Sequence, residues 1–196
     1  MGKILVIGAR GRAGRAAVDE ARSRGHEVTP VARTTEGAPA GAVPGDVTDV
    51  ARTAELVTGH DAVIATVYDG GSEFFPNAAR ALVDALGETR LIWVSLASLI
   101  PAADGTLVMD TPGFPEQYRS FSLAHRAALD TFAASTLDWV AFAPAGDFNH
   151  ADPTRTGTYR LGPGDLTALT SYADFAIALV DEYERAAHQR EVLGVV

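Results

Sequence analysis

Residues 3–14, Lys-Ile-Leu-Val-Ile-Gly-Ala-Arg-Gly-Arg-Ala-Gly, decide the fold of this 196-residue chain. The apolar, β-branched run at 4–7 ends at a glycine, which is typical of a strand buried on both faces of a parallel sheet. Residues 13–24 carry alanines at helical spacing, and Gly25 stands where a helix-ending glycine belongs. Residues 27–31 predict a second strand. Strand, tight turn, helix and strand within about 30 residues make one βαβ unit.

The turn of this unit contains three glycines, Gly8, Gly11 and Gly14. In a dinucleotide site the first such glycine permits the sharp turn, the second lets a pyrophosphate approach the backbone, and the third lets the helix pack on the sheet. The N–H groups of the first helical turn then face the anion. We therefore predict that a dinucleotide is bound by the loop residues Gly8, Ala9, Arg10, Gly11, Arg12, Ala13 and Gly14. A tight turn without a ligand is the alternative interpretation.

The end of the second strand indicates which coenzyme binds. NAD sites carry an acidic residue there for the ribose hydroxyls, and NADP sites carry a basic group for the 2′-phosphate. This chain has Arg33 at that point and no acid before Glu36, and Arg10 and Arg12 could reach the same region. We expect NADP(H) to be preferred over NAD(H). The competing interpretation is that these arginines are solvated surface charges.

The alternation of strands and helices continues along the whole chain. Apolar runs predict further strands at 43, 62–66, 91–95, 139–143, 158–161 and 192–196. Helical periodicity covers 50–57, 75–86, 116–134 and 172–184. We expect one α/β domain over residues 1–196, a doubly wound, Rossmann-type three-layer sandwich with a mainly parallel sheet. The irregular stretch 145–170 would be a small C-terminal elaboration on the substrate side.

Composition narrows the classes of function. Hydrophobic residues make up 47% of the chain and charged residues 21%, as in ordinary globular proteins. The net charge of −9 disfavours nucleic acid and anionic membranes as partners. Cysteine is absent, which excludes disulfides and thiolate chemistry, and the scattered histidines predict no metal site. The short apolar start lacks a signal-peptide core, so we expect a cytoplasmic protein, with a homodimer left open.

Two further pairs of residues fit the adenine and ribose margins of a dinucleotide site. Asp46 and Val47 follow the third strand, and Ala65 and Thr66 lie at the end of the fourth. Asp46 would accept a hydrogen bond from the adenine amino group, while Val47 would pack near the ring. Asp46 could equally be a turn or cap residue.

With these motifs, the chain resembles the NAD(P)-binding atypical short-chain dehydrogenase/reductases. Within them it is similar to the NmrA-like and NADH-flavin reductase branch, which includes biliverdin-reductase-B-like proteins. The resemblance covers essentially the whole chain and rests on 3–11, Gly14, 25–28, Arg33, 45–47, 110–112, Tyr118, 124–125 and 137–139. Members commonly have Gly-Ala-Thr-Gly where this chain has Gly-Ala-Arg-Gly, so Arg10 adds positive charge to the loop.

Dehydrogenases of this superfamily use a Tyr-x-x-x-Lys pair, in which the lysine lowers the pKa of the tyrosine and holds the nicotinamide ribose. Here Ser122 stands four residues after Tyr118, and Lys3 is the only lysine in the chain. Alcohol–ketone dehydrogenation by such a pair is therefore disfavoured, as are the epimerase and dehydratase reactions of extended relatives. The resemblance instead implies hydride transfer to a planar acceptor, such as a flavin or quinone, stacked on the nicotinamide.

Residues after the fifth and sixth strands are the candidates for this chemistry. We place the nicotinamide near Ser95, Leu96 and Pro144. The candidate catalytic residues are Ser95, Tyr118 and His125. The acceptor pocket would be lined by Phe114, Tyr118, Phe148 and His150. Each also has a structural interpretation, and for His125 a hydrogen-bonded core histidine is favoured over a proton donor.

Two functions from different classes are consistent with these observations. The leading hypothesis is an NADPH-dependent reductase of flavins, quinones or similar planar acceptors. The alternative is a non-catalytic NADP(H)-binding redox sensor, as NmrA-like proteins can be, which would pass the NADP/NADPH ratio to a protein partner. The missing tyrosine–lysine pair is compatible with both.

Overall fold

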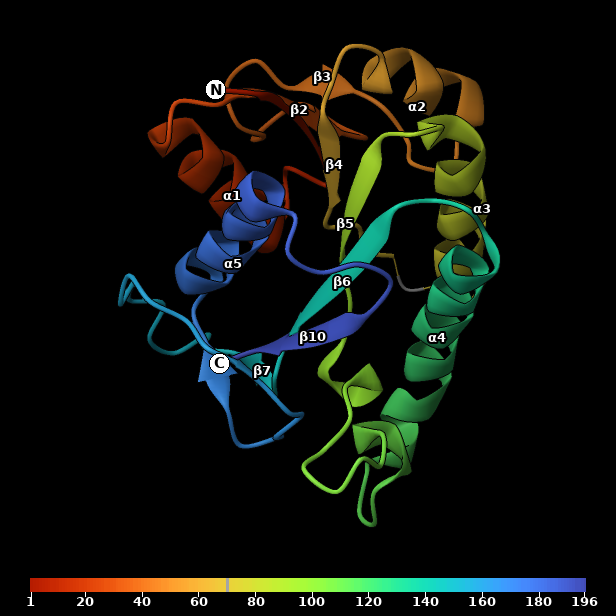
Figure 1. Cartoon of the computed structure of the whole chain (residues 1–196), viewed down its shortest axis with the longest axis vertical. Coiled ribbons are helices and arrows are strands. Elements are labelled where there is room, and N and C mark those ends of the chain that lie inside the picture. The colour runs from red at the N-terminus through yellow and green to blue at the C-terminus, as the bar shows by residue number, and fades with distance from the viewer. Residues whose placement is uncertain (70) are drawn as a thin grey trace.

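The computed structural model describes residues 1–69 and 71–196, and strands from both ends of the chain meet in its central sheet (Figure 1). Over those residues the sheet has eight strands, in the order β3-β2-β1-β4-β5-β6-β10-β8. In chain order they are β1 Lys3–Ile7, β2 Glu27–Ala32, β3 Val43–Pro44, β4 Ala62–Ala65, β5 Arg90–Val94, β6 Trp139–Pro144, β8 Leu161–Gly162 and β10 Val192–Val195. Strand β8 pairs antiparallel with β10, and the other strands of this sheet pair in parallel.

Strand β1 explains why the opening apolar run shows no alternation. Leu5 and Ile7 belong to one hydrophobic core cluster, whereas Ile4 and Val6 belong to a second one. Successive side chains of a strand point to opposite faces, so a strand covered on both faces needs apolar residues at every position. All four side chains are buried, as the sequence predicted.

Helices cover both faces of the sheet. Helices α1 (Arg12–Ser23) and α5 (Tyr172–Arg185) pack together on one face, and α2 (Val50–Val57), α3 (Phe74–Leu86) and α4 (Arg119–Ala134) cover the other (Figure 1). The three-layer, doubly wound α/β fold expected from the sequence is confirmed. Among the described residues, no helix has the length and apolar character needed to cross a membrane.

The strand order creates a crevice at the carboxyl edge of the sheet. From β1 the chain moves outward to β2 and β3, and then returns to the other side of β1 with β4. Ile7 is in register with Val31 on one side and with Ala65 on the other, so the three strands end at similar levels beside Gly8. Loops diverge at such a reversal, which is where open α/β sheets bind their ligands.

The stretch 145–170 departs from the elements predicted for it. The strand expected at 158–161 is displaced and shortened to β8. Just before the expected strand, the backbone amides of Thr156 and Gly157 donate to the carboxylate of Asp174, at 3.0 Å and 2.8 Å. This carboxylate fixes the segment to the start of α5.

Two other differences concern element ends. Strands β7 (Asp147–Phe148) and β9 (Leu169–Thr170), which the sequence did not predict, pair in parallel with each other outside the main sheet. The helix expected at 116–134 begins as the separate 3₁₀ turn Glu116–Tyr118, and α4 starts at Arg119. The proline at 115 precedes that turn, which fits the bias of proline toward the start of a helical segment.

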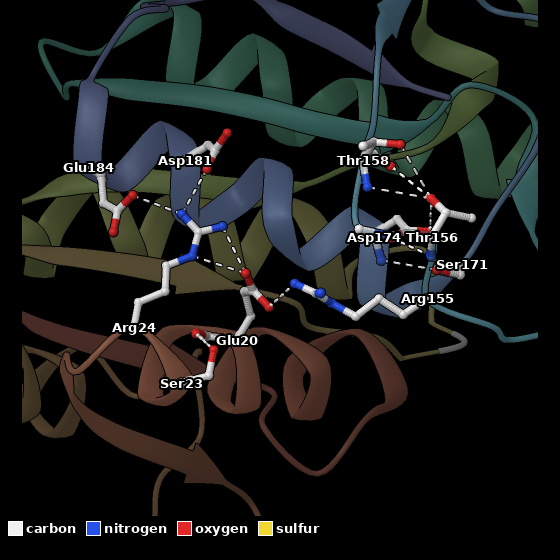
Figure 2. A network of polar contacts seen from close by, with 11 residues as sticks. Glu20, Ser23, Arg24, Arg155, Thr156, Thr158, Ser171, Asp174, Asp181 and Glu184 are labelled. Atoms are coloured by element: carbon white, nitrogen blue, oxygen red, sulfur yellow. Dashed lines mark hydrogen bonds and ion pairs between the residues drawn. The ribbon is translucent and has the colours of Figure 1, made fainter.

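A network of ion pairs joins α1 to α5 (Figure 2). The guanidinium of Arg24 lies 2.7 Å from Asp181, 2.8 Å from Glu184 and 2.8 Å from Glu20. Arg155 of the irregular stretch reaches the other carboxylate oxygen of Glu20 at 2.9 Å. The network therefore holds α1, α5 and the irregular stretch in one arrangement, and with them the first turn of α1 beside the glycine loop.

Candidate functional site

Two of the three loop glycines are required by the fold itself. Gly8 has a φ of +85°, and a Cβ on it would lie 2.5 Å from the carbonyl oxygen of Thr66. A Cβ on Gly14 would lie 2.4 Å from the carbonyl oxygen of Gly8. Both distances are far shorter than van der Waals contact, so a side chain at either position requires the backbone to shift. These glycines press the loop against the residue after β4 and pack α1 onto the sheet.

The fold restricts the side chain at position 11 less than at positions 8 and 14. Its φ of −68° is open to any residue, and a Cβ there would meet its nearest neighbour, the Gly8 carbonyl oxygen, at 3.3 Å. Gly11 is also the N-cap of α1 and, among the described residues, gives the helix no side-chain cap. The amides of the first turn are thus left for an anion that approaches bare backbone.

A cavity of about 640 Å³ opens beside Gly11, at the carboxyl ends of β1, β2 and β4. Its volume is within the range of small-molecule sites. The lining comprises Ile7, Gly8, Arg10, Gly11, Ala32, Arg33, Thr34, Gly45, Asp46, Val47, Thr66, Val67, Tyr68 and Phe74. Half of these lining residues were expected from the sequence. Tyr68 and Phe74 were not, although both follow β4, on the side of the site that the sequence assigned to adenine and ribose.

Residues after β3 and β4 shape the cavity wall. The Thr66 hydroxyl donates to the carbonyl groups of Ile7 and Gly8, at 3.2 Å each, while Ala65 is fully buried behind it. Asp46 accepts bonds from the backbone and the hydroxyl of Thr48, at 2.9 Å and 2.8 Å, and also lines the cavity. Asp46 therefore closes a turn and faces the cavity at once, so the turn interpretation and the ligand interpretation are compatible.

The three arginines expected near the coenzyme lie in two different places. Arg10 and Arg33 line the cavity, and Arg33 pairs with Asp69 at 3.0 Å. Arg12 was expected to be able to reach the same region, but its guanidinium instead lies 2.8 Å from Nδ1 of His150 and 5.0 Å from the centre of the Tyr172 ring. The positive charge at the cavity therefore comes from Arg10 and Arg33.

The ends of β5 and β6 bury the residues expected near the nicotinamide. Ser95 is 3% exposed, and its backbone amide donates to Phe142 at 2.7 Å. Within the described part of the chain, its hydroxyl has no hydrogen-bond partner. Leu96 is half-buried, and Pro144 is buried at the end of β6. A buried hydroxyl without a partner is costly, so Ser95 is a polar group that a ligand could satisfy.

His125 is a core residue on α4, buried between Phe75 and Phe121. The imidazole lies 3.6 Å from the ring centre of Phe75 and 4.9 Å from that of Phe121. Neither ring nitrogen has a hydrogen-bond partner among the described residues, in contrast to the bonded histidine that the sequence favoured. Burial lowers the pKa of His125 to about 3, so the side chain is neutral at physiological pH.

Tyr118 lies on the surface, as the sequence allowed, with 55% of the residue exposed. Ser122, which stands where the superfamily has lysine, is buried, and its hydroxyl lies 2.9 Å from that of Ser98 and 3.0 Å from the carbonyl oxygen of Tyr118. Ser122 therefore serves the first turn of α4 and the packing of the segment after β5.

The residues expected to line an acceptor pocket pack against different core layers. Phe114 packs on the α2–α3–α4 side, whereas Phe148 packs on the α1–α5 side and stacks on Tyr172 with ring centres 4.0 Å apart. His150 lies beside Tyr172 and Arg12. Tyr172 was missed, because its place in a helical pattern gave no sign that it would face a distant loop. Among the described residues, no cluster of three or more His, Cys, Asp or Glu could hold a metal ion.

Comparison with known families gives a match over most of the chain. The model of a family described as NAD(P)H-binding matches residues 8–184. Among curated proteins, the uncharacterized protein YwnB of Bacillus subtilis (strain 168) is 34% identical over 211 aligned positions, covering 99% of this chain and 98% of that protein.

Two solved structures show the same fold. The first, from Streptococcus pneumoniae TIGR4 and described as a "putative NADH-flavin reductase", has a TM-score of 0.88 and 32% identity, covering 100% of this chain and 99% of that one. The second, a "putative epimerase" from Bacteroides thetaiotaomicron, has a TM-score of 0.85 and 29% identity, covering 99% of this chain and 96% of that one. The likeness in both cases extends over essentially the whole chain.

Proposed function

The chain belongs to the NAD(P)H-binding family, and from this premise we propose that it is an NADPH-dependent reductase of flavins, quinones or similar planar acceptors. The observation that carries the proposal is the cavity at the glycine loop, where Gly11 leaves the backbone bare beside two arginines. The structure described as a "putative NADH-flavin reductase" supports the acceptor class by likeness.

The residues of the loop fit a dinucleotide. Gly11 and the first-turn amides of α1 would hold the pyrophosphate, since Gly11 lets an anion approach the backbone and the amides lie at the positive end of the helix. Asp46, Val47 and Thr66 would hold the adenosine. The coenzyme supplies a hydride when bound, and the part played by the protein is to hold and orient it and to exclude water.

The preference for NADPH over NADH is proposed from the charge at the cavity. Arg33 follows β2, where the ribose of the adenosine half is bound in this fold, and Arg10 lines the same cavity. A guanidinium binds a phosphate through two parallel hydrogen bonds, which a ribose hydroxyl cannot match. The acidic residue usual in NAD sites is absent at position 33.

We infer a reaction that needs no tyrosine–lysine pair. Lys3 is the only lysine, and it lies at the amino end of β1, where it pairs with Glu27 at 3.5 Å. Ser95 is the proposed polar contact at the reacting end, because its buried hydroxyl lacks a partner among the described residues. The exposed Tyr118 and the neutral, buried His125 stay secondary candidates, and the proton would come from solvent.

The second candidate function is a non-catalytic NADP(H) sensor. It is favoured by one observation, namely that Phe114 and Phe148 pack on opposite core layers and so do not form one acceptor wall. A sensor would bind NADPH and NADP⁺ with similar affinity and would turn over neither.

The test is NADPH oxidation by the full chain, followed at several concentrations of riboflavin, FMN and a benzoquinone. A reductase should oxidise NADPH with saturation in the acceptor, and Gly11→Ala should abolish most of this rate while the protein stays folded. Tight binding of NADPH and NADP⁺ without turnover on any acceptor would support the sensor instead. Absence of heat with every nicotinamide coenzyme in calorimetry would reject both functions.

A further inference from the structure

The ion pair between Arg33 and Asp69 bridges two segments that border the cavity. Arg33 follows β2 and Asp69 comes a few residues after β4, and β1 lies between these strands in the sheet. Neighbouring strands are about 4.8 Å apart, so the pair spans two strand spacings near the glycine loop. Arg33 itself and Tyr68, the neighbour of Asp69, both line the cavity. The pair therefore lies beside the cavity, with Arg33 on its lining.

The carboxylate of Asp69 is fixed in place where an anion is expected. One of its oxygens lies 3.0 Å from the Arg33 guanidinium, and the other accepts a hydrogen bond from the backbone amide of Gly71 at 3.1 Å. Arg33 is the group expected to bind a coenzyme 2′-phosphate. The protein thus supplies its own anion to the guanidinium that would recognise the ligand anion.

We propose that Asp69 determines coenzyme specificity by competing with the 2′-phosphate for Arg33. This inference rests on the proposed function. A phosphate bears up to two negative charges and accepts two hydrogen bonds from a guanidinium, so it displaces the Asp69 carboxylate from Arg33. A coenzyme without the 2′-phosphate leaves the pair intact. Asp69 therefore lowers the affinity for NADP(H) and reduces the difference in affinity between NADP(H) and NAD(H).

Exposure of the pair makes this exchange feasible. The Arg33 side chain is 60% exposed and that of Asp69 is 37% exposed, and ion pairs in such positions are weak and screened by salt. Asp46, the acidic residue that lines the cavity, accepts hydrogen bonds from Thr48. Asp69 is thus the carboxylate that acts on Arg33.

The experiment measures binding of 2′,5′-ADP and 5′-ADP, which differ in the 2′-phosphate, to the full chain by calorimetry. Asp69→Asn keeps the shape of the side chain, and it should tighten 2′,5′-ADP about three- to tenfold and 5′-ADP less than about twofold. In a background of Arg33→Met, Asp69→Asn should no longer change 2′,5′-ADP binding selectively. Asp130→Asn, which removes the same charge from an exposed pair on α4, is the matched control and should change neither ligand.

Three outcomes would overturn the inference. Weaker binding of both ligands to Asp69→Asn would make Asp69 a direct ligand of the ribose. If Asp69→Asn tightened 2′,5′-ADP binding equally with and without Arg33, the effect of Asp69 would be general charge repulsion. Unchanged binding of 2′,5′-ADP would leave Asp69 no role in coenzyme specificity. Binding of neither ligand by the unmodified protein would overturn the proposed function as well, which separates the two failures.

Discussion

The two halves of the carboxyl edge of the sheet are built differently. Beside β1, β2 and β4 the edge opens into a cavity lined by bare backbone at Gly11 and by Arg10 and Arg33. Beside β5 and β6 the corresponding residues, Ser95 and Pro144, are buried. The difference indicates that the proposed coenzyme half is ready for its ligand, whereas the acceptor half is covered by the chain itself.

The irregular stretch folds back on itself beside the end of β6. A Cβ on Gly146 would lie 2.4 Å from the carbonyl oxygens of both Asp165 and Ala168, so the two ends of the stretch lie directly against each other. The Ala145 carbonyl accepts from Asp165 at 2.8 Å, and the Asp147 amide donates to Ala168 at 3.1 Å. Backbone hydrogen bonds thus tie the two ends of the stretch together next to the buried Pro144.

The largest expected effect separates the two kinds of loop glycine in the open half. Gly14→Ala should lower the free energy of unfolding by about 3 kcal/mol or more, because the new methyl group meets backbone. Gly11→Ala should cost less than about 1 kcal/mol, yet weaken NADPH binding by about tenfold or more. Thermal melts and calorimetry on both variants measure this contrast. Equal loss of stability in the two variants would mean that Gly11 serves the fold.

The next effect tests the charge of the open half. Arg33→Met should weaken NADPH binding by about tenfold, since a hydrogen bond to a charged group contributes roughly 1.5–3 kcal/mol. NADH binding should change by less than about twofold. The ratio of the two dissociation constants, measured at one ionic strength, is the quantity to compare. An equal loss for both coenzymes would contradict a role for Arg33 in recognition of the 2′-phosphate.

A third prediction concerns His125, the buried histidine on α4. The pKa of His125 is about 3 when folded and about 6.5 when unfolded, so the unfolded chain binds more protons between these values. The free energy of unfolding should therefore fall as the pH falls through this window. His125→Leu should remove about 2 kcal/mol of the loss between pH 6.5 and 4.5. Urea titrations at each pH measure it, and parallel curves for both proteins would refute the neutral, buried state.

The smallest effect concerns the buried hydroxyl at the end of β5. Ser95→Ala should leave stability unchanged or slightly higher, since it removes a polar group that lacks a protein partner among the described residues. The rate of NADPH oxidation should fall about three- to tenfold if Ser95 contacts the reacting groups. Ser23→Ala, at the exposed last position of α1, is the matched control and should change the rate by less than about twofold. A rate unaffected by Ser95→Ala would remove Ser95 from the site.

Local pattern was enough to predict the framework and the glycine loop. The unbroken apolar run of β1 requires cover on both faces, and the two core clusters provide it. The carboxyl-edge position of Arg33 and Asp46 followed from where strands end. These features depend on residues within a few positions of each other, which is why sequence reasoning reached them.

Contacts between distant segments could not be predicted in this way. Arg12 meets His150, 138 positions along the chain, and Arg33 meets Asp69, 36 positions along. Phe114 and Phe148 were both expected to line one pocket, yet they pack on opposite core layers, because the direction of a side chain outside the main sheet depends on the whole tertiary structure. The shift of β8 away from 158–161 could not be predicted for the same reason, since the segment before it is bound by Asp174 of α5.

The solitary lysine has a practical consequence for surface-based measurements. Lys3 begins β1, and its side chain is 54% exposed and is the only lysine in the 196 residues. Gly8 lies at the other end of the strand, about 16 Å away at the usual rise per residue. Coupling to a sensor chip or bead through lysine side chains would therefore attach every molecule by the amino end of β1. The cavity would then face outward on all of them, and an immobilised layer would be uniformly oriented for coenzyme titrations.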